Sequence, residues 1–299
     1  MKTLTVFTPA YNRAHTIGRT YESLCRQTSN DFEWLVIDDG SQDNTEELVN
    51  GWICEGRIPI RYIKQKNQGM HGAHNTAYAN IATELNVCID SDDWMPDDAV
   101  ERIVNFWKEN GSEKYAGIVG LDQRADGSII GSRFSDSLRE TTLSGYYAAG
   151  GSGDKKLVYR TDVVKKYPQY PLFPGERYVG LAYLYMLIDS DYELLVLNAP
   201  LVVVEYQAEG SSNSMYRQYW NNPRGFAFYR KTEMCMSPGL KRRFISCVHY
   251  VSSCIISGER DWLKSSPKKL MTLMAAPMGV ALYMWIKHKV KQGAKMVTR

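Results

Sequence analysis

The chain has 299 residues, with 36 lysines and arginines against 33 aspartates and glutamates, and a formal net charge of +3. A chain of this length buries a sizeable core. The small net charge, without a basic stripe interleaved with aromatic residues, excludes nucleic acid as an expected partner. Six cysteines without a Cys-x-x-Cys pair predict free thiols. The N-terminus lacks a long apolar stretch typical of a signal peptide, so we expect a cytoplasmic location.

The first third of the sequence alternates between strand-like and helix-like segments. Short apolar runs predict strands at residues 4–8, 32–37, 60–63 and 85–89. Apolar residues at helical spacing predict the intervening helices, for example at Ile17, Tyr21, Leu24 and Cys25. This order predicts an α/β fold, with a Rossmann-like, mostly parallel central sheet flanked by helices.

Polar clusters follow three of the predicted strands. They are Thr8-Pro9-Ala10-Tyr11-Asn12, Asp38-Asp39-Gly40-Ser41 and Asp90-Ser91-Asp92-Asp93. In open α/β sheets, ligands bind beyond the carboxyl ends of the strands. The convergence of these clusters therefore predicts a binding site at that edge.

The third cluster places three carboxylates, Asp90, Asp92 and Asp93, at one strand end. Like charges at this spacing need a compensating charge, and a hard divalent cation with oxygen ligands supplies it. The alternative is that Asp92 or Asp93 caps a following helix with Pro96 near its first turn. Capping accounts for one or two of the acids but not for all three.

The other two clusters suit a nucleotide. Tyr11 can stack on a base, and Asp39 can accept a hydrogen bond from the imide N–H of uracil. Asp38 is less suited, because strand alternation turns it differently from Asp39. Each cluster also has a plain structural alternative, a turn into a helix at Tyr11 and a turn with a helix cap after Asp39.

Four segments, TVFTPAYNR, FEWLVIDDGSQDNT, NQGMHGAHN and CIDSDDWMPDD, resemble the family 2 glycosyltransferases in order and spacing. The resemblance is specific over about residues 1–110 and weaker to about 215. It implies a GT-A fold and a metal-dependent, inverting transfer of a sugar from a nucleoside diphosphate. The nucleotide-site residues that it implies are Thr8, Pro9, Tyr11, Asp39, Asn75, Asp90, Ser91 and Asp93. Asp92, with Asp90, is the implied ligand of Mn²⁺ or Mg²⁺ in a D-x-D pattern.

The chain departs from the family in its third segment, where His74 stands before Asn75 in place of a common arginine. Neutral histidine cannot replace the fixed guanidinium fork. His74 can still donate one hydrogen bond, and His71 can compensate. Two histidines at a helix start are the structural alternative.

The resemblance also implies a catalytic base near the start of a helix downstream of the metal motif. Glu176 matches that place, although Arg177 stands where an aspartate is common. The alternative for Glu176 is a helix N-terminal residue that complements the dipole. The other candidate bases are Asp154, which follows a Gly-rich loop expected to be flexible, Asp189 and Asp191. Residues 205–213 are expected to form a flap over the donor.

We expect a GT-A domain over residues 1–215, with a nucleotide-binding half at about 1–110 and an acceptor half at about 111–215. Residues 216–299 are expected to form a helical, basic extension. Within it, the apolar run 270–286 has lysines on both sides, and Pro277 and Gly279 are expected to interrupt it. An interfacial helix on anionic lipid, a spanning helix and a core or oligomer-contact helix all remain open.

These features together predict an inverting hexosyl- or N-acetylhexosaminyltransferase that uses a nucleoside-diphosphate sugar, of which a UDP-sugar is the expected form. The expected acceptor is a saccharide, in particular a lipid-linked one in bacterial surface-polysaccharide synthesis at the inner membrane face. Two alternatives remain. A sugar nucleotidyltransferase usually carries a Gly-rich loop after the first strand, and TPAYNR has no glycine. A non-catalytic glycan- or partner-binding relative has no need of all three acids.

Overall fold

The computed structural model describes residues 2–205 and 215–297, which divide into two compact units. The first unit runs to Pro168 and includes Ile188–Glu205; the second contains Gln169–Leu187 and the chain after Glu205. The expected division near residue 215 differs from this, because residues 169–187 join the helical unit. Most of the expected flap, residues 206–213, lies outside the described residues.

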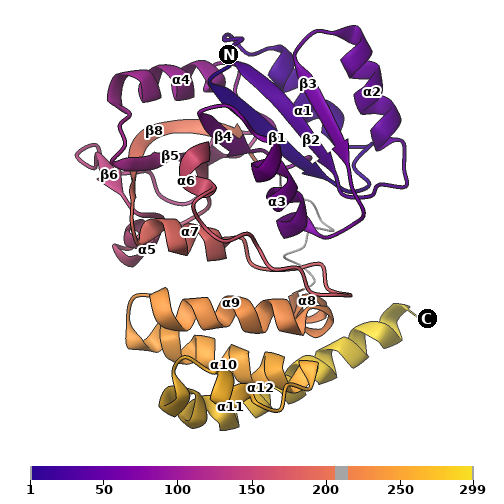
Figure 1. The fold of residues 1–299 in the computed structure, drawn as a ribbon, viewed down its shortest axis with the longest axis vertical. Helices are drawn as coiled ribbons and strands as arrows, with labels where there is room; N and C mark the ends of the chain where they lie inside the picture. The colour runs from indigo at the N-terminus through magenta and orange to yellow at the C-terminus, as the bar shows by residue number, and fades with distance from the viewer. Residues whose placement is uncertain (1, 206–214, 298–299) are drawn as a thin grey trace. The chain divides into compact units, whose positions relative to one another are not determined.

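The first unit is built on an eight-stranded sheet flanked by helices, with the order β3-β2-β1-β4-β7-β5-β8-β6 (Figure 1). The strands are β1 Leu4–Ala10, β2 Phe32–Asp38, β3 Ile60–Lys64, β4 Leu85–Cys88, β5 Tyr115–Gln123, β6 Glu140–Thr141, β7 Lys155–Arg160 and β8 Glu193–Val203. The helices that lie between these strands in the chain are α1 Ile17–Cys25, α2 Thr45–Glu55, α3 Met70–Asn80, α4 Ala99–Asn110, α5 Leu143–Ala148, α6 Thr161–Val164 and α7 Ala182–Asp189, of which most of α7 belongs to the second unit. The expected α/β fold is confirmed.

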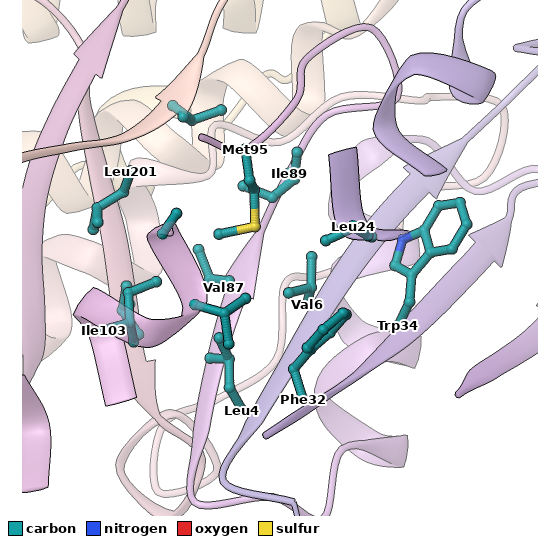
Figure 2. Close-up of a cluster of buried hydrophobic side chains, with 14 of the residues drawn as sticks. Leu4, Val6, Leu24, Phe32, Trp34, Val87, Ile89, Met95, Ile103 and Leu201 are labelled. Atoms are coloured by element: carbon teal, nitrogen blue, oxygen red, sulfur yellow. The ribbon is translucent and has the colours of Figure 1, made fainter. Parts of the chain in front are cut away.

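All seven residues of β1 are buried, because helices cover both faces of the sheet at this strand. Val6 belongs to the core that also contains Tyr21 of α1 and Val49 of α2. Phe7, the next residue, packs edge-on against His74 of α3, with ring centroids 5.1 Å apart. Figure 2 shows the core that contains Val6, in which side chains from β1, β2 and β4 meet those of α1 and α4.

Strand β7 is antiparallel to both of its neighbours, β4 and β5, whereas β1, β2, β3 and β4 pair in parallel. The sequence did not predict β7. Its antiparallel direction matters for the site, because the first residues of β7 lie at the same edge as the last residues of β4 and β5. Strand β8 runs beside β5 with a register shift near Pro200.

The second unit contains α8 Met215–Asn221, α9 Pro223–Met236, α10 Leu240–Ser257, α11 Trp262–Ser265 and α12 Lys269–Val297. Its core gathers Met234, Cys247, Tyr250 and Ala275. The expected interruption at Pro277 and Gly279 is wrong, since α12 continues through both residues. Gly279 faces α10, where an added Cβ would lie 2.6 Å from Val251 Cβ. This close helix–helix contact supports α12 at the point where proline removes an N–H donor.

Candidate active site

The ends of β1, β2 and β4 bring the three polar clusters to one edge of the sheet. Ala10 at the end of β1 pairs with Asp38 at the end of β2, and Phe7 pairs with Cys88 at the end of β4. The residues that follow these strands, Tyr11, Asp39 and Asp90, therefore leave the sheet at the same edge. This convergence is what the sequence predicted.

The loop after β1 is fixed by the loop after β2. The Asn12 N–H donates to Ser41 Oγ at 2.9 Å, and Asn12 Oδ1 accepts from the Gln42 N–H at 2.8 Å. Asn12 has a φ of 54°, in the left-handed region that asparagine tolerates. Tyr11 keeps 46% of its surface exposed, so its ring is available for stacking. This arrangement presents an aromatic ring on a rigid loop.

Two of the predicted site residues lie inside the sheet rather than at its edge. Thr8 is fully buried, and its Oγ1 accepts a hydrogen bond from Trp34 Nε1 at 2.9 Å. Pro9 is also buried. Their side chains are therefore placed to support the loop at Tyr11, and the structure does not bring the Thr8 hydroxyl to the surface.

Asp38, the last residue of β2, and Asp39, which follows it, make different contacts. Asp38 Oδ1 accepts from the Ser41 N–H at 2.7 Å, and Asp38 Oδ2 accepts from the Tyr62 hydroxyl. Asp39 is almost fully buried and accepts from Gln65 Nε2 at 2.7 Å and from the backbone N–H groups of Gln68 and Gly69 at 2.8 and 2.7 Å. Gly69 immediately precedes α3, so Asp39 also complements the positive end of that helix.

The histidines of the third segment are part of the α3 packing. His74 is buried, and its Nδ1 lies 2.9 Å from the Met70 carbonyl oxygen. Burial lowers the pKa of His74 to about 4, so the ring is neutral at physiological pH. A buried neutral histidine does not replace an arginine on phosphate. Asn75 and His71 are also buried on α3.

The acidic segment is not a helix cap. Helix α4 begins at Ala99, several residues after Asp93. Asp90 and Asp92 are half-buried, whereas Ser91 and Asp93 are buried. These positions leave the two outer acids of the Asp90-Ser91-Asp92 triplet accessible, and they exclude the capping alternative for Asp92 and Asp93.

Burial and mutual repulsion shift the titration of these acids. The pKa of Asp92 is raised, first by burial and then by the charge of Asp90, while Arg13 and Arg19 act in the opposite direction. Burial also raises the pKa of Asp93 to about 7. Asp93 Oδ1 accepts the Glu205 N–H at 3.3 Å. The segment is thus short of positive charge, as the sequence predicted.

Two further charged residues at this edge, Asp122 and Lys156, were not predicted. Asp122, near the end of β5, is buried, and burial raises its pKa to about 6. Among the hydrogen bonds of the described residues, none engages Asp122 Oδ1. Burial alone would lower the pKa of Lys156, but the charges of Asp122 and Asp90, among others, raise it. Asp122 ends an apolar run, the same signal that revealed Asp39 and Asp90.

The Gly-rich loop before β7 is held by several contacts. Lys155 is buried, and its Nζ donates to the carbonyl oxygens of Ile130, Ser152 and Asp154 at 3.2, 2.8 and 3.1 Å. The loop also packs on Gly131, where an added Cβ would lie 2.1 Å from the Ser152 carbonyl oxygen. These contacts tie the loop to residues 130 and 131, while its flexibility stays a prediction. Its clamp fixes the backbone of Asp154, whose side chain is exposed at the carboxyl edge.

The remaining base candidates carry structural contacts. Glu176 is buried in the second unit, and its Oε1 accepts from the Arg224 N–H and Nε at 3.1 and 2.9 Å. Its Oε2 accepts from the Gly225 N–H at 2.8 Å. Glu176 therefore serves the N-terminus of α9 and not of the helix that follows it in the chain, since α7 begins only at Ala182. Its catalytic role stays untested.

Asp189 and Asp191 precede β8 and thus lie at the opposite end of that strand from the carboxyl edge. Asp189 accepts from the backbone N–H groups of Leu143 and Ser144 at 3.2 and 2.7 Å, at the start of α5. Asp191 Oδ2 accepts from the Tyr167 hydroxyl at 2.7 Å. These contacts, and their place in the sheet, favour structural roles.

The residues present fit a divalent cation that the substrate completes. Asp90 and Asp92 offer accessible carboxylates that repel each other. In the part of the chain that the structure describes, no three histidine, cysteine, aspartate or glutamate side chains converge as a preformed metal centre. Mg²⁺ in phosphate-transferring sites is commonly held by one or two carboxylates with substrate oxygens and water. Asp90 and Asp92 have the character of such a partial site.

A separate cavity of about 710 Å³ lies at the opposite edge of the sheet, lined by residues that include Glu84, Trp107 and Arg160. Several of its charged groups are already engaged. Glu84 Oε1 accepts from Trp107 Nε1 at 2.7 Å, and Arg160 pairs with Asp162 at 2.7 Å. The cavity is larger than a water site, but its chemistry points to packing and ion pairing rather than to the reaction.

A family model described as glycosyl transferase family 2 matches residues 5–166, more than half of the chain. The chain belongs to glycosyl transferase family 2. The matched region contains all three polar clusters and Asp122, Asp154 and Lys156. The resemblance found in the sequence is thus confirmed.

The relatives have names that refer to sugar transfer. Poly(ribitol-phosphate) beta-N-acetylglucosaminyltransferase TarP of Staphylococcus aureus is 32% identical over 124 residues, which cover 41% of this chain and 38% of that protein. An uncharacterized glycosyltransferase of Nostoc is 30% identical over 177 residues, 57% of this chain and 54% of that protein. The chain thus matches about half or less of the length of these curated relatives.

Among solved structures, Staphylococcus aureus TarS 1-349 in complex with UDP-GlcNAc superposes with a TM-score of 0.60 and 17% identity, covering 98% of this chain and 92% of that one. The mannosyltransferase PcManGT from Pyrobaculum calidifontis, in complex with GDP-Man and Mn²⁺, gives a TM-score of 0.54 and 15% identity, with coverage of 99% and 81%. At these identities the likeness concerns the fold, and it confirms the GT-A prediction.

Proposed function

We propose that the protein is an inverting, metal-dependent glycosyltransferase that moves a hexose or N-acetylhexosamine from a nucleoside-diphosphate sugar to a saccharide. The observation that carries this proposal is the meeting of Tyr11, Asp39 and the Asp90–Asp93 segment at one sheet edge. The aromatic ring of Tyr11 suits stacking on a nucleotide base, and the buried carboxylate of Asp39 suits the base pocket. The accessible carboxylates of Asp90 and Asp92 suit a cation bound to the diphosphate. The complex of TarS with UDP-GlcNAc supports a UDP-sugar as the first donor to test.

In this proposal the nucleotide lies across the ends of β1, β2 and β4. The exposed ring of Tyr11 stacks on the base, and Asp39 shapes the base pocket through the backbone N–H groups of Gln68 and Gly69 that it holds. Arg13 and Arg19, whose charges already act on Asp92, face the diphosphate. Thr8 and Pro9 support this loop from inside the sheet.

Asp92 and Asp90 hold Mn²⁺ or Mg²⁺ in this proposal, which the PcManGT complex with Mn²⁺ supports by analogy. When bound, the cation neutralises charge on the departing nucleoside diphosphate. Asp93 is buried, and its carboxylate accepts a hydrogen bond from the Glu205 backbone N–H. Asp93 therefore serves to position the segment in the proposed site.

We propose Asp154 as the general base in preference to Glu176. Its carboxylate is exposed at the sheet edge of the metal motif, on a backbone that Lys155 clamps. A base at this position takes the proton of the acceptor hydroxyl as that oxygen bonds to the anomeric carbon and the bond to the diphosphate oxygen breaks. Glu176 is less suited, because Arg224 and Gly225 already engage both of its oxygens.

We also propose a class of acceptor. The TarP relative is named for a polymer, poly(ribitol-phosphate), which supports a saccharide of a bacterial surface polymer as the acceptor class. We propose a lipid-linked form, used by a peripheral enzyme at the cytoplasmic face of the membrane. The basic, apolar C-terminal helix is the feature of this chain that supports it.

A sugar nucleotidyltransferase and a non-catalytic binding relative are the alternatives. A screen of nucleoside-diphosphate sugars for release of the nucleoside diphosphate, with and without saccharide acceptors, separates them from a transferase. The transferase releases the nucleoside diphosphate from one donor faster when its acceptor is present. A nucleotidyltransferase instead produces pyrophosphate from a nucleoside triphosphate and a sugar phosphate. Saccharide binding without turnover of any donor would identify the non-catalytic relative.

A further inference from the structure

Helix α12 leaves a broad apolar face exposed. Six large residues of this face are between 45 and 72% exposed: Leu270, Leu273, Met274, Met278, Met284 and Trp285. At 100° per residue they fall within one half of the helix surface. Monomeric soluble proteins rarely expose a contiguous apolar patch of this kind without a partner.

The opposite face of α12 is committed to its own unit. Thr272, Ala275 and Ile286 are buried on that face, and Gly279 meets Val251 of α10. Thr272 Oγ1 lies 2.6 Å from Ser266 Oγ. By length and composition Lys269–Gln292 passes as a membrane span, with 22% of its most apolar window buried. If α12 spanned a membrane, this face would lose its packing against α10, whereas a helix that lies in the plane of the interface keeps this packing.

The ends of the exposed face are basic. Residues 264–291 contain six lysines, at positions 264, 268, 269, 287, 289 and 291, and no aspartate or glutamate. Lys269, Lys287 and Lys289 are exposed. Juxtamembrane lysines strengthen binding to an anionic leaflet. Trp285 adds the amphipathic ring that favours the headgroup region.

We propose that α12 docks by this apolar face on an anionic phospholipid surface, lying in the plane of the interface with its lysines on the headgroups. A second copy of the chain is a poorer occupant, because a self-complementary contact would bring two lysine-rich segments together. The lipid contact stands independently of catalysis. Its use, to hold the enzyme where a lipid-linked acceptor lies, rests on the proposed function.

The test is flotation of the full chain with phosphatidylcholine vesicles that contain or lack phosphatidylglycerol. The protein should float with the anionic vesicles, and added salt should weaken binding. The double variant Leu273→Glu and Met274→Glu should lose about tenfold or more in affinity, since it removes two apolar side chains from the contact and adds two negative charges beside an anionic surface. Ile53→Glu is the matched control, an exposed apolar residue on α2 of the other unit.

Unchanged thermal unfolding of the double variant shows that its fold is intact, as expected for two exposed positions. Equal flotation of wild type and double variant would overturn the proposal. So would a wild-type dimer that the double variant dissociates, with no binding to either vesicle. Resistance of the membrane-bound protein to alkaline carbonate would overturn the in-plane placement. Donor hydrolysis in solution, measured in parallel, tests the proposed function separately. If the protein hydrolyses no donor but still floats with anionic vesicles, the proposed function fails and the lipid contact stands.

Discussion

The ammonium of Lys156 donates to the carbonyl oxygen of Cys88 at 3.2 Å, which ties the start of β7 to the end of β4. Because Cys88 precedes Asp90 by two residues, this contact places the Lys156 ammonium beside the start of the acidic segment. The charges of Asp122, Asp90 and Asp93 all act on it. Lys156 therefore offsets repulsion among acids that come from two different strands.

Removing that cation should make stability more sensitive to pH. In Lys156→Met, repulsion among the carboxylates grows as they ionise, so we expect a loss of about 1–3 kcal/mol near pH 8. Near pH 5 the loss should be smaller, because Asp93 and Asp122, with pKa values of about 7 and about 6, are then protonated. Thermal unfolding at the two pH values measures this. An equal loss at both would mean that Lys156 acts through packing alone.

Asp93 should make the metal-free protein less stable as pH rises. Its pKa is about 7 in the folded protein against an ordinary 3.8. Between these values the unfolded chain has released a proton that the folded chain keeps, so stability falls as pH rises through the window. Asp93→Asn keeps an acceptor for the Glu205 N–H and removes the titration.

The variant Asp93→Asn should therefore be more stable than the wild type at pH 8, by on the order of 1–3 kcal/mol, with the difference vanishing toward pH 4. Denaturant unfolding across this range in chelator gives the comparison. A wild type that gains stability from pH 5 to pH 8 relative to Asp93→Asn would contradict the burial argument.

Substitutions of Asp154 and Glu176, two of the candidate bases, should have opposite effects on turnover and stability. Asp154→Asn should lower kcat by about 10²- to 10⁴-fold with little change in stability, because the side chain is exposed. Glu176→Gln should lower stability by about 1–3 kcal/mol through lost charge-assisted bonds to α9, while the folded variant retains turnover. Kinetics and unfolding of both variants separate the roles. A folded Glu176→Gln enzyme without turnover would return Glu176 to the chemistry.

Tyr11 should act on donor binding rather than on folding. Base–aromatic stacking contributes about 1–3 kcal/mol, so Tyr11→Ala should weaken nucleotide affinity about 5- to 150-fold. Its melting temperature should barely change, since the side chain is 46% exposed. Tyr11→Phe, which keeps the ring, is the matched control and should bind as the wild type does. Equal loss in both variants would assign the effect to the hydroxyl.

The first half of the sheet could be predicted because its signals are local. Buried runs such as Leu4–Ala10 end where polar residues begin, and parallel strands bring those ends together. Asp122 ends a run of the same kind and could have been found in this way. The sequence also located Asp39, but not the bonds to Gln68 and Gly69 that bury it, because those donors lie about thirty residues away.

The sequence-based predictions fail where contacts between distant segments of the chain decide the structure. Strand β7 carries lysines at its start, and only pairing with β4 and β5 makes it a strand. The Glu176 contacts depend on a helix 48 residues downstream. The continuity of α12 through Pro277 depends on its packing against α10, which propensity alone does not include.

In the proposed site, Asp92 takes part in binding a cation whose coordination a nucleoside diphosphate completes. Isothermal titration calorimetry of UDP with the full chain tests it most directly, in Mn²⁺ and in chelator, for wild type and Asp92→Asn. We expect the wild type to bind UDP in Mn²⁺ and much more weakly in chelator, and Mn²⁺ to have little effect on binding by the variant. Wild-type binding of equal strength in Mn²⁺ and in chelator, or Mn²⁺-dependent binding that survives in Asp92→Asn, would contradict it.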